Sequence, residues 1–498
     1  MDKQINLLTK LGRRTAAIFA LALAMFQSLP AAAYVPDDRW SITASGATGG
    51  TGTPVTLTWS IAPDGTNIPG EGASNLVSYL DGLFGVTSGG SNLTTRPWFT
   101  YFQQSVDRWT QLGGITFVYE SHDDGTSLQT TSGALGTRGD VRIGGAFVDG
   151  PSNTLAYTWL PNSGDMVIDT GETNFYSNSS NAYRQLRNTV MHELGHAFGL
   201  LHIESSTENL LMEPIINLSF DGPQLDDIRG LQGQYGDAFE KTNNGLGNGT
   251  AARATSLGAL AIGGSLDVGS DAVGNQFVGA TETDFVSIAN ANDADFFSFT
   301  IAAPASLDAT LTPLGGVFNQ GVEGGVQSSF DANSRNDLTL SVFASNGTTL
   351  LGTANLTSAG SVESLTDIAL ATAGKYYARI TGASENVQLY QLLLSAASLV
   401  TVLPGDYNLD GTVDAADFTV WRNMLGRTGS NLAADGNGDG VVNASDYDLW
   451  KTHFGTSGAG SGGIAVAGSV PEPSGVVLAC VAAACAFQLR NRPAPRRA

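Results

Sequence analysis

Three histidines and a glutamate at fixed spacing constrain the fold more than any other feature of this 498-residue chain. They lie in the segment His192-Glu193-Leu194-Gly195-His196-Ala197-Phe198-Gly199-Leu200-Leu201-His202. Residues four apart lie one turn apart on the same face of a helix, so His192 and His196 can share one cation. Gly199 can end that helix in a conformation that other residues resist, and the chain can then deliver His202 as a third ligand. The segment predicts a helix over residues 182–199 that ends at a metal site.

The chemistry of this segment is that of a catalytic zinc. Three neutral imidazoles leave the fourth position of a tetrahedral zinc ion open, whereas a structural zinc is closed by four protein ligands. Glu193 lies beside the helical histidines, where it can reach a water at the metal without being a ligand. We therefore expect one zinc ion on His192, His196 and His202, and we expect Glu193 to be the general base of peptide-bond hydrolysis.

Met212 follows His202 by ten residues, in the segment Asn209-Leu210-Leu211-Met212-Glu213-Pro214. A methionine on a tight turn beneath the zinc is the hallmark of the metzincins. With this turn, residues 34–238 resemble the matrixin branch of that family. Gln224–Ile228 and Gln232–Gly236 are similar to its closing helix, and Gly164–Asp169 to its edge strand. The resemblance implies an α+β domain, with a mixed twisted sheet plus helices, and metalloendopeptidase activity.

The chain also departs from the matrixin pattern. No cysteine precedes the domain, which excludes a cysteine switch as the latency mechanism. The loop between His202 and Met212 is longer than the usual matrixin loop. The segment Ile215–Leu218 is expected to form one wall of the substrate pocket, and Asp169 and Glu172 are candidate ligands of a structural calcium.

Hydrophobic periodicity predicts further elements of this domain. Alternating or short apolar runs indicate strands at 55–61, 115–120, 140–143 and 166–168. Apolar residues at helical spacing indicate helices at 96–113 and 223–234.

A change of composition predicts a second domain. Residues 239–255 are rich in Gly, Asn and Thr and are expected to be a linker. In residues 256–400, short apolar runs alternate with turn-forming clusters, as in a β-sandwich. Asp293–Phe299 and Lys375–Ile380 resemble the best-marked strands of the pre-peptidase C-terminal domain, although a generic surface β-domain would carry similar strands.

Residues 404–456 contain an internal repeat with the spacing of calcium loops. Positions one, three, five, seven, nine and twelve are occupied by Asp406, Asn408, Asp410, Thr412, Asp414 and Asp417, and again by Asp435, Asn437, Asp439, Val441, Asn443 and Asp446. A glycine takes position six in each loop, where the chain turns sharply. Each loop is followed by one expected helix, 418–425 and 447–454. The repeat resembles a type I dockerin, which implies two calcium ions and a cohesin partner; a calcium-stabilised spacer is the alternative.

Both ends of the chain look like targeting segments. Residues 1–33 combine basic residues, an apolar run and small residues, and are expected to be a signal peptide. Residues 471–498 join Pro-Glu-Pro, a short apolar run and an Arg-rich tail, after a flexible linker at 457–470. They resemble a PEP-CTERM sorting signal, which implies an exosortase-type processing enzyme and membrane contact; an ordinary C-terminal anchor is the alternative. Either reading predicts an exported protein, extracellular or on the cell surface.

The whole sequence thus predicts a multidomain chain: an α+β domain of the metzincin type, a β-sandwich, and a small α module of calcium loops. The net charge of -22 argues against nucleic acid as a partner. We expect a zinc metalloendopeptidase that acts on protein or peptide substrates. The alternative is a non-catalytic, calcium-dependent adhesion or scaffold protein that acts through the dockerin and the β-sandwich.

Overall fold

The computed structural model describes residues 38–130, 132–274, 277–356, 358–399 and 403–457. They belong to two compact units, Met1–Leu399 and Val400–Ala498. The expected signal peptide, the expected sorting segment and nearly all of the linker at 457–470 lie outside the described residues. Among the described residues, no helix is both long enough and apolar enough to cross a membrane.

The N-terminal module, residues 38–238, is built on one five-stranded sheet. Its strands are β3 (Val55–Ile61), β6 (Ile115–Tyr119), β7 (Val141–Ala146), β8 (Ala156–Thr158) and β9 (Met166–Asp169). They are ordered β6-β3-β7-β9-β8, and only the pairing of β8 with β9 is antiparallel. The sheet is mixed, and the four strands predicted from apolar runs are confirmed.

The edge strand differs from our expectation. Residues 164–169 were expected at the edge of the sheet, but β9 pairs with β7 on one side and with β8 on the other. Every residue of β9 is buried, which suits an interior strand, whereas all three residues of β8 are only half-buried. The edge strand is therefore β8.

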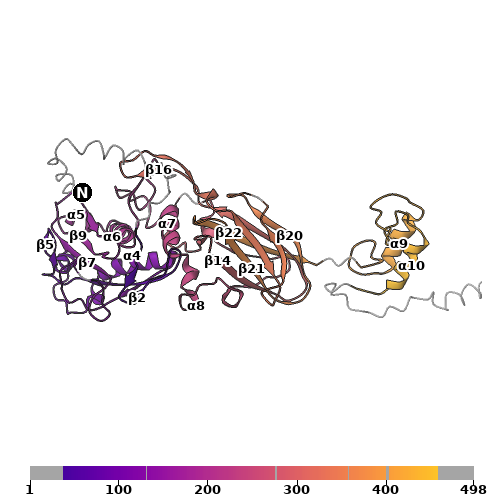
Figure 1. The fold of residues 1–498 in the computed structure, drawn as a ribbon, viewed down its shortest axis with the longest axis horizontal. Coiled ribbons are helices and arrows are strands. Elements are labelled where there is room, and N and C mark those ends of the chain that lie inside the picture. Colours follow the sequence, from indigo (N-terminus) through magenta and orange to yellow (C-terminus); the bar gives the residue numbers. More distant parts are fainter. Residues whose placement is uncertain (1–37, 131, 275–276, 357, 400–402, 458–498) are drawn as a thin grey trace, which may run out of the picture. The chain divides into compact units, whose positions relative to one another are not determined.

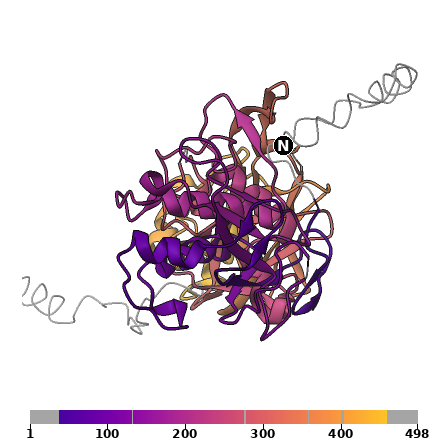
Figure 2. The same ribbon diagram turned by 90° about the vertical axis from the view of Figure 1, so that its left-hand side faces the viewer.

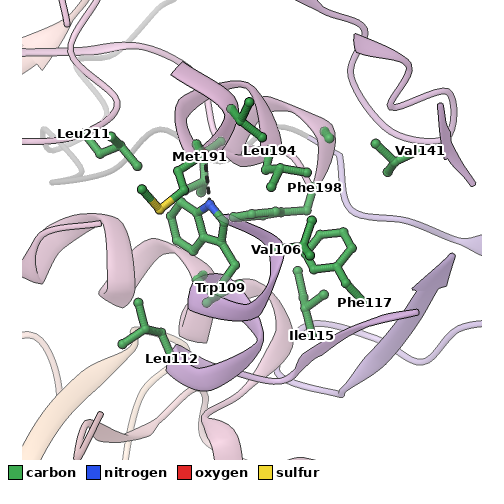
Figure 3. Packing of buried hydrophobic residues seen from close by; sticks show 14 of the residues in the cluster. Val106, Trp109, Leu112, Ile115, Phe117, Val141, Met191, Leu194, Phe198 and Leu211 are labelled. Atoms are coloured by element: carbon green, nitrogen blue, oxygen red, sulfur yellow. Dashed lines mark hydrogen bonds between the residues drawn. The ribbon is translucent and has the colours of Figure 1, made fainter. Parts of the chain in front are cut away.

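The module has four main helices, α3 (Leu76–Leu83), α4 (Phe99–Leu112), α6 (Arg184–Ala197) and α7 (Leu225–Tyr235); α3, α4 and α6 contact the sheet, and α7 packs against α4. The apolar residues of α4 recur at helical spacing, so one stripe of the helix, including Phe102, Val106 and Trp109, is buried. Figure 3 shows how α4 meets α6: the indole N–H of Trp109 donates to the carbonyl oxygen of Met191 at 2.9 Å. The three helices predicted from the sequence are confirmed within three residues at each end.

The second module is a β-sandwich. One sheet has the order β11-β14-β21-β18-β19 and the other has the order β12-β22-β15-β20, with β13 paired to β22. The strands are β11 (Thr255–Ala259), β12 (Ser265–Val268), β13 (Val286–Ile288), β14 (Ala294–Ile301), β15 (Ala305–Leu314), β18 (Leu338–Phe343), β19 (Leu350–Ala354), β20 (Glu363–Leu370), β21 (Gly374–Gly382) and β22 (Gln388–Ser398). The segments Asp293–Phe299 and Lys375–Ile380, singled out in the sequence, lie almost entirely in β14 and β21, which are antiparallel neighbours.

The two modules share buried contacts. Phe285 and Leu389 of the sandwich belong to the same apolar core cluster as Trp109 and Leu231 of the N-terminal module. The buried amide of Gln232 donates to the carbonyl oxygens of both Leu112 and Phe285. Residues 239–255, expected to be a linker, form the short helices η4 (Ala238–Lys241), α8 (Thr242–Gly245) and η5 (Ala251–Arg253).

A third, smaller sheet joins the modules directly. Strand β10 (Ile203–Ser205) follows His202, and it pairs antiparallel with β16 (Val317–Val322), which pairs with β17 (Ser328–Asp331). Figures 1 and 2 show the β16–β17 hairpin reaching from the sandwich to the N-terminal module. Nothing in the sequence predicted this sheet.

The second unit contains the calcium repeat. Its helices are α9 (Ala415–Met424) and α10 (Ala444–His453). Each begins at position ten of its loop, three residues before the predicted start, and ends one residue before the predicted end. The two halves exchange equivalent hydrogen bonds: Trp421 Nε1 donates to the carbonyl of Asn443, and Trp450 Nε1 donates to the carbonyl of Asp414. The two loop–helix units are therefore linked by one hydrogen bond in each direction.

Candidate metal centre

The sharp end of α6 brings the three predicted histidines together. His192 and His196 lie on α6, which ends at Ala197. Gly199 adopts φ +105°, and a Cβ there would lie 2.4 Å from the carbonyl oxygen of Asp38. Only glycine satisfies both conditions, so the chain can turn here and place His202 opposite the helical pair.

The three imidazoles converge on one point. The Nε2 atoms of His192 and His202 are 3.1 Å apart, and one ligand nitrogen from each of the three rings lies within 4.8 Å of the others. Two nitrogens bound to one tetrahedral zinc ion at about 2.0–2.1 Å lie about 3.3–3.4 Å apart. The spacing therefore fits a zinc ion.

Each ring is also held in the tautomer that a zinc ligand needs. Nδ1 of His192 lies 2.7 Å from the carbonyl oxygen of Leu211, and Nδ1 of His196 lies 2.6 Å from that of Leu200. Nδ1 of His202 lies 2.9 Å from Oε2 of Glu323. Carbonyl and carboxylate oxygens accept protons in such bonds, so each Nδ1 carries the hydrogen and each Nε2 keeps its lone pair.

Burial keeps the two helical ligands neutral. It lowers the pKa of His192 to about 4, with a further decrease from the nearby charge of His202. Burial also lowers the pKa of His196 well below its ordinary value. Because a metal binds the unprotonated imidazole, both rings are ready to act as ligands at neutral pH.

Glu193 lies beside the ligands and is itself buried, with 5 % of its surface exposed. Its Oε2 accepts a hydrogen bond from Thr158 Oγ1 of the edge strand β8, at 2.8 Å. Burial raises the pKa of Glu193 to about 7, although the hydrogen bond from Thr158 opposes this shift. A carboxyl group with a pKa near neutrality can both take up and release a proton.

Met212 packs beneath α6, as the resemblance implied. It is buried, and a Cβ on Gly195 would lie 2.3 Å from its sulfur atom. The turn is fixed by Asp227 of α7, whose carboxylate accepts the backbone N–H groups of Leu211, Met212 and Gln224. Burial raises the pKa of Asp227 to about 7.

The metal centre opens into a cleft of about 860 Å³. His192, Glu193 and His202 line it, together with Ala156 of the edge strand β8 and, on another side, Ile215. Ile215 is 83 % exposed, so it offers an unpaired apolar surface to a ligand in the cleft. Of the expected wall, residues 215–218, only Ile215 and Ile216 line the cleft.

The expected calcium ligands of the N-terminal module have backbone partners. The carboxylate of Asp169 accepts N–H groups from Val148, Gly150 and Gly171. Oε1 of Glu172 accepts the N–H of Ser152. Both carboxylates therefore order the loops beside the cleft, and their role as calcium ligands stays a prediction.

The two calcium loops have nearly the same internal hydrogen bonds. In the first, Asp406 accepts the N–H of Gly411, and Asp417 accepts those of Tyr407, Asn408 and Asp414. In the second, Asp435 accepts the N–H of Gly440, and Asp446 accepts those of Gly436, Asn437 and Asn443. Asn408 and Asn437 donate to Asp410 and Asp439 in the same way. The backbone of each loop thus brings its acidic side chains together.

Three residues of the metal centre were not recognised in the sequence. Thr158 is one threonine in a three-residue strand, and Asp227 resembles an ordinary acidic residue in the first turn of a helix. Glu323 lies 121 positions from His202, with no motif around it. Of the three, only Asp227 had a signal in the sequence. It lies 15 residues after Met212, in the segment that resembles the closing helix of the matrixins.

Comparisons with known proteins agree with this geometry. Residues 87–236 match the family model of the matrixins, and residues 404–455 match that of the type I dockerin domain. The chain therefore contains a matrixin domain, of a zinc metalloendopeptidase family, and a dockerin domain.

Several metalloendoproteinases are similar to the N-terminal module. Metalloendoproteinase 1-MMP of Arabidopsis thaliana is 29 % identical over 172 residues, which are 32 % of this chain and 45 % of that protein. Metalloendoproteinase 2-MMP of the same plant is 31 % identical over 27 % of this chain and 36 % of its own length. Matrix metalloproteinase-2 of Drosophila melanogaster is 34 % identical over 28 % of this chain and 18 % of its own length. The chain spans less than half the length of these relatives.

Among solved structures, the pre-peptidase C-terminal domain of a collagenase from Bacillus anthracis is similar to 29 % of this chain, over 95 % of that domain. The identity is 12 % and the TM-score is 0.16. A periplasmic lysozyme inhibitor from Aeromonas hydrophila matches 28 % of this chain with 12 % identity and a TM-score of 0.15.

Proposed function

We propose that this protein is an exported zinc metalloendopeptidase, with Glu193 as its general base. The observation that carries the proposal is the convergence of one ligand nitrogen from each of three histidines beside a buried carboxyl group that lines a cleft. A retired protease would have no need to keep Glu193, its three metal ligands and the tautomer-fixing acceptors together.

Peptide hydrolysis follows from this arrangement. A zinc ion held by His192, His196 and His202 would supply Lewis-acid chemistry, which lowers the pKa of a water and polarises a peptide carbonyl. Glu193 takes the proton of the attacking water, because its pKa near 7 leaves a useful fraction of it ionised. It then returns that proton to the leaving amine. Thr158 holds the carboxylate in place through its hydrogen bond to Oε2.

The edge strand β8 gives the substrate an orientation. Its outer side has no partner strand among the described residues, and the strand ends at Thr158, which contacts Glu193. An extended peptide can pair with such an edge through its own backbone. The exposed side chain of Ile215 provides apolar contact within the same cleft.

The test uses the full chain, because the sandwich shares a core with the N-terminal module. Casein or gelatin cleavage is measured for the wild type, for Glu193→Gln, and for the control Glu385→Gln, which removes a carboxylate from an exposed loop of the sandwich. We expect Glu193→Gln to bind zinc normally and to lose activity by about 10²–10⁴-fold. A chelator should abolish cleavage by the wild type. Full activity in Glu193→Gln would contradict the proposal.

We further propose that the dockerin domain attaches the enzyme to a cohesin module in a calcium-dependent way. Support comes from the family match and from the near-identical hydrogen bonding of the two loops. The sequence of residues 1–33 and 471–498 supports export and exosortase-type sorting to the cell surface. If a zinc-loaded chain cleaves no protein, the adhesion or scaffold function becomes the better account.

A further inference from the structure

The β16–β17 hairpin of the sandwich is paired to the strand that follows the third zinc ligand. Ile203, Glu204 and Ser205 of β10 face Val322, Gly321 and Gln320 of β16. The pairing continues beyond β10, where the N–H of Ser206 donates to the carbonyl of Asn319 at 2.9 Å. The backbone of β16 is therefore fixed in register against the segment that carries His202.

Side chains at the base of the hairpin hold it in place. Gln320 is fully buried, and its Nε2 lies 3.3 Å from Oδ2 of Asp226 on α7. The guanidinium carbon of Arg229, also on α7, lies 4.8 Å from the centre of the Phe330 ring on β17. The hairpin thus contacts both the ligand-bearing segment and the closing helix.

The tip of the hairpin reaches the metal centre. Glu323 directly follows β16, and its Oε2 lies 2.9 Å from Nδ1 of His202. The other two ligands meet backbone carbonyls of the N-terminal module itself, at Leu211 and Leu200. Only His202 depends on a side chain, and that side chain comes from the sandwich.

We propose that the sandwich completes the zinc site, with Glu323 as a positioning residue for His202; this rests on the zinc site of the proposed function. A carboxylate on the far nitrogen of a ligating histidine fixes the ring and its tautomer and makes the ligating nitrogen more basic. His202 needs such support, because its side chain is 28 % exposed and Glu323 is the partner of its Nδ1.

The segment after His202 fits this role. The first residues of the segment between His202 and Met212 form β10. They therefore provide the edge to which β16 adds. Without β10, strand β16 would have no partner in the N-terminal module, and Glu323 would not be positioned beside the imidazole of His202.

The experiment measures zinc affinity on the full chain, by competition with a chromophoric chelator. The variants are Glu323→Ala, Glu323→Gln and the control Glu385→Gln, which removes the same charge elsewhere on the sandwich. We expect the zinc Kd to rise about 10–100-fold in Glu323→Ala, because outer partners of ligating histidines contribute on that scale. The zinc Kd should rise less in Glu323→Gln, since the amide oxygen of Gln can still accept the Nδ1 hydrogen of His202. The control should match the wild type.

A second readout separates positioning from folding. Cobalt replaces zinc, and its visible absorption reports ligand geometry; the spectrum should change in Glu323→Ala and return towards that of the wild type in Glu323→Gln. Equal zinc affinities and equal cobalt spectra in all variants would overturn the inference while leaving the peptidase proposal intact. Failure of the wild type to bind zinc would overturn both.

Discussion

Gly195 and Met212 show how closely single residues are fitted around the metal centre. Gly195 lies on α6 between the two helical ligands, and Met212 packs against its missing side chain. The same methionine receives the N–H of Ile203 on its carbonyl oxygen, so it connects α6 to the segment after His202. The close packing of the Met212 side chain against Gly195, which involves no hydrogen bond, therefore helps to position the metal ligands.

Replacing Gly195 by alanine should destabilise the protein. The new methyl group would lie 2.3 Å from the sulfur of Met212, which is buried and has little space to move. Overpacking of this kind costs about 1–3 kcal/mol, which should lower the thermal unfolding temperature and weaken zinc binding. The control is Gly82→Ala in α3, where a Cβ meets nothing within 4 Å. That change should be neutral or stabilising, and equal melting temperatures for the two variants would disprove the steric account.

At the scale of elements, the calcium repeat is two loop–helix units with equivalent ends. The position-twelve residues Asp417 and Asp446 are both buried, and both complete a capping box at the start of their helix. Each of these residues therefore has two roles: it is the last residue of its loop, and its side chain caps the first turn of the following helix. Losing either carboxylate should affect a calcium ligand and a helix start together.

Asp417→Asn and Asp446→Asn should each remove one calcium site. The amide nitrogen of asparagine would face a backbone N–H that the carboxylate now accepts. Calcium titration calorimetry on the full chain should show one equivalent fewer than the wild type in either variant. Asp448→Asn, on the exposed face of α10, is the matched control and should leave the number unchanged. An unchanged stoichiometry in both loop variants would refute the assignment of these loops.

Helices and strands with a strong hydrophobic periodicity were predicted well from the sequence. Short strands that form only because they pair with other strands were not. The buried run of β3 and the apolar stripe of α4 define their own ends, since the pattern is local. The edge strand β8 has only three residues, too few for a pattern. Strand β16 contains Gly321 and Asn319, which are poor strand formers, and it exists because β10 and β17 pair with it.

The same distinction holds for the metal centre. His192, Glu193, His196 and His202 lie within eleven residues, so the geometry of α6 and the turn at Gly199 are enough to bring them together. Thr158 and Glu323 reach them from other elements, at separations of 35 and 121 positions. Their contacts depend on tertiary packing, which the spacing of residues in one sequence does not reveal.

At the scale of the whole molecule, four carboxyl groups meet where the N-terminal module joins the sandwich. They are Asp237, Glu240, Asp293 and Asp295, and oxygens of the last three lie within 4.8 Å of one another. Burial and the charge of Asp293 raise the pKa of Asp237 to about 7 and, with Asp237, that of Glu240 to about 8. Burial raises the pKa of Asp293 to about 6 and that of Asp295 well above its ordinary value. In the folded chain these groups therefore hold protons that the unfolded chain releases.

Stability should fall as the pH rises through this range. Unfolded Asp and Glu lose their protons near pH 4, so between about pH 4 and pH 8 the folded state binds more protons. The slope of unfolding free energy against pH is then negative. Thermal unfolding in a chelator should show a lower midpoint at pH 8 than at pH 5.

Asp295→Asn should make this pH dependence shallower. Asn can still accept the hydrogen bond that Tyr390 now donates to Oδ2 of Asp295, and it removes one titratable carboxyl from the group. Asp107→Asn, on the exposed face of α4, serves as the control and should follow the wild-type curve. Parallel curves for Asp295→Asn and the wild type would show that this group does not control the pH dependence.

The pairing of β10 with β16 also has a consequence for the order of events in a newly made chain. Synthesis proceeds from the N-terminus, so the histidine segment emerges well before residues 317–331. The strand pairing beside His202 must wait for more than a hundred further residues to arrive and fold. A metal centre assembled in this order would be completed late, only after residues 317–331 have been synthesised and have folded.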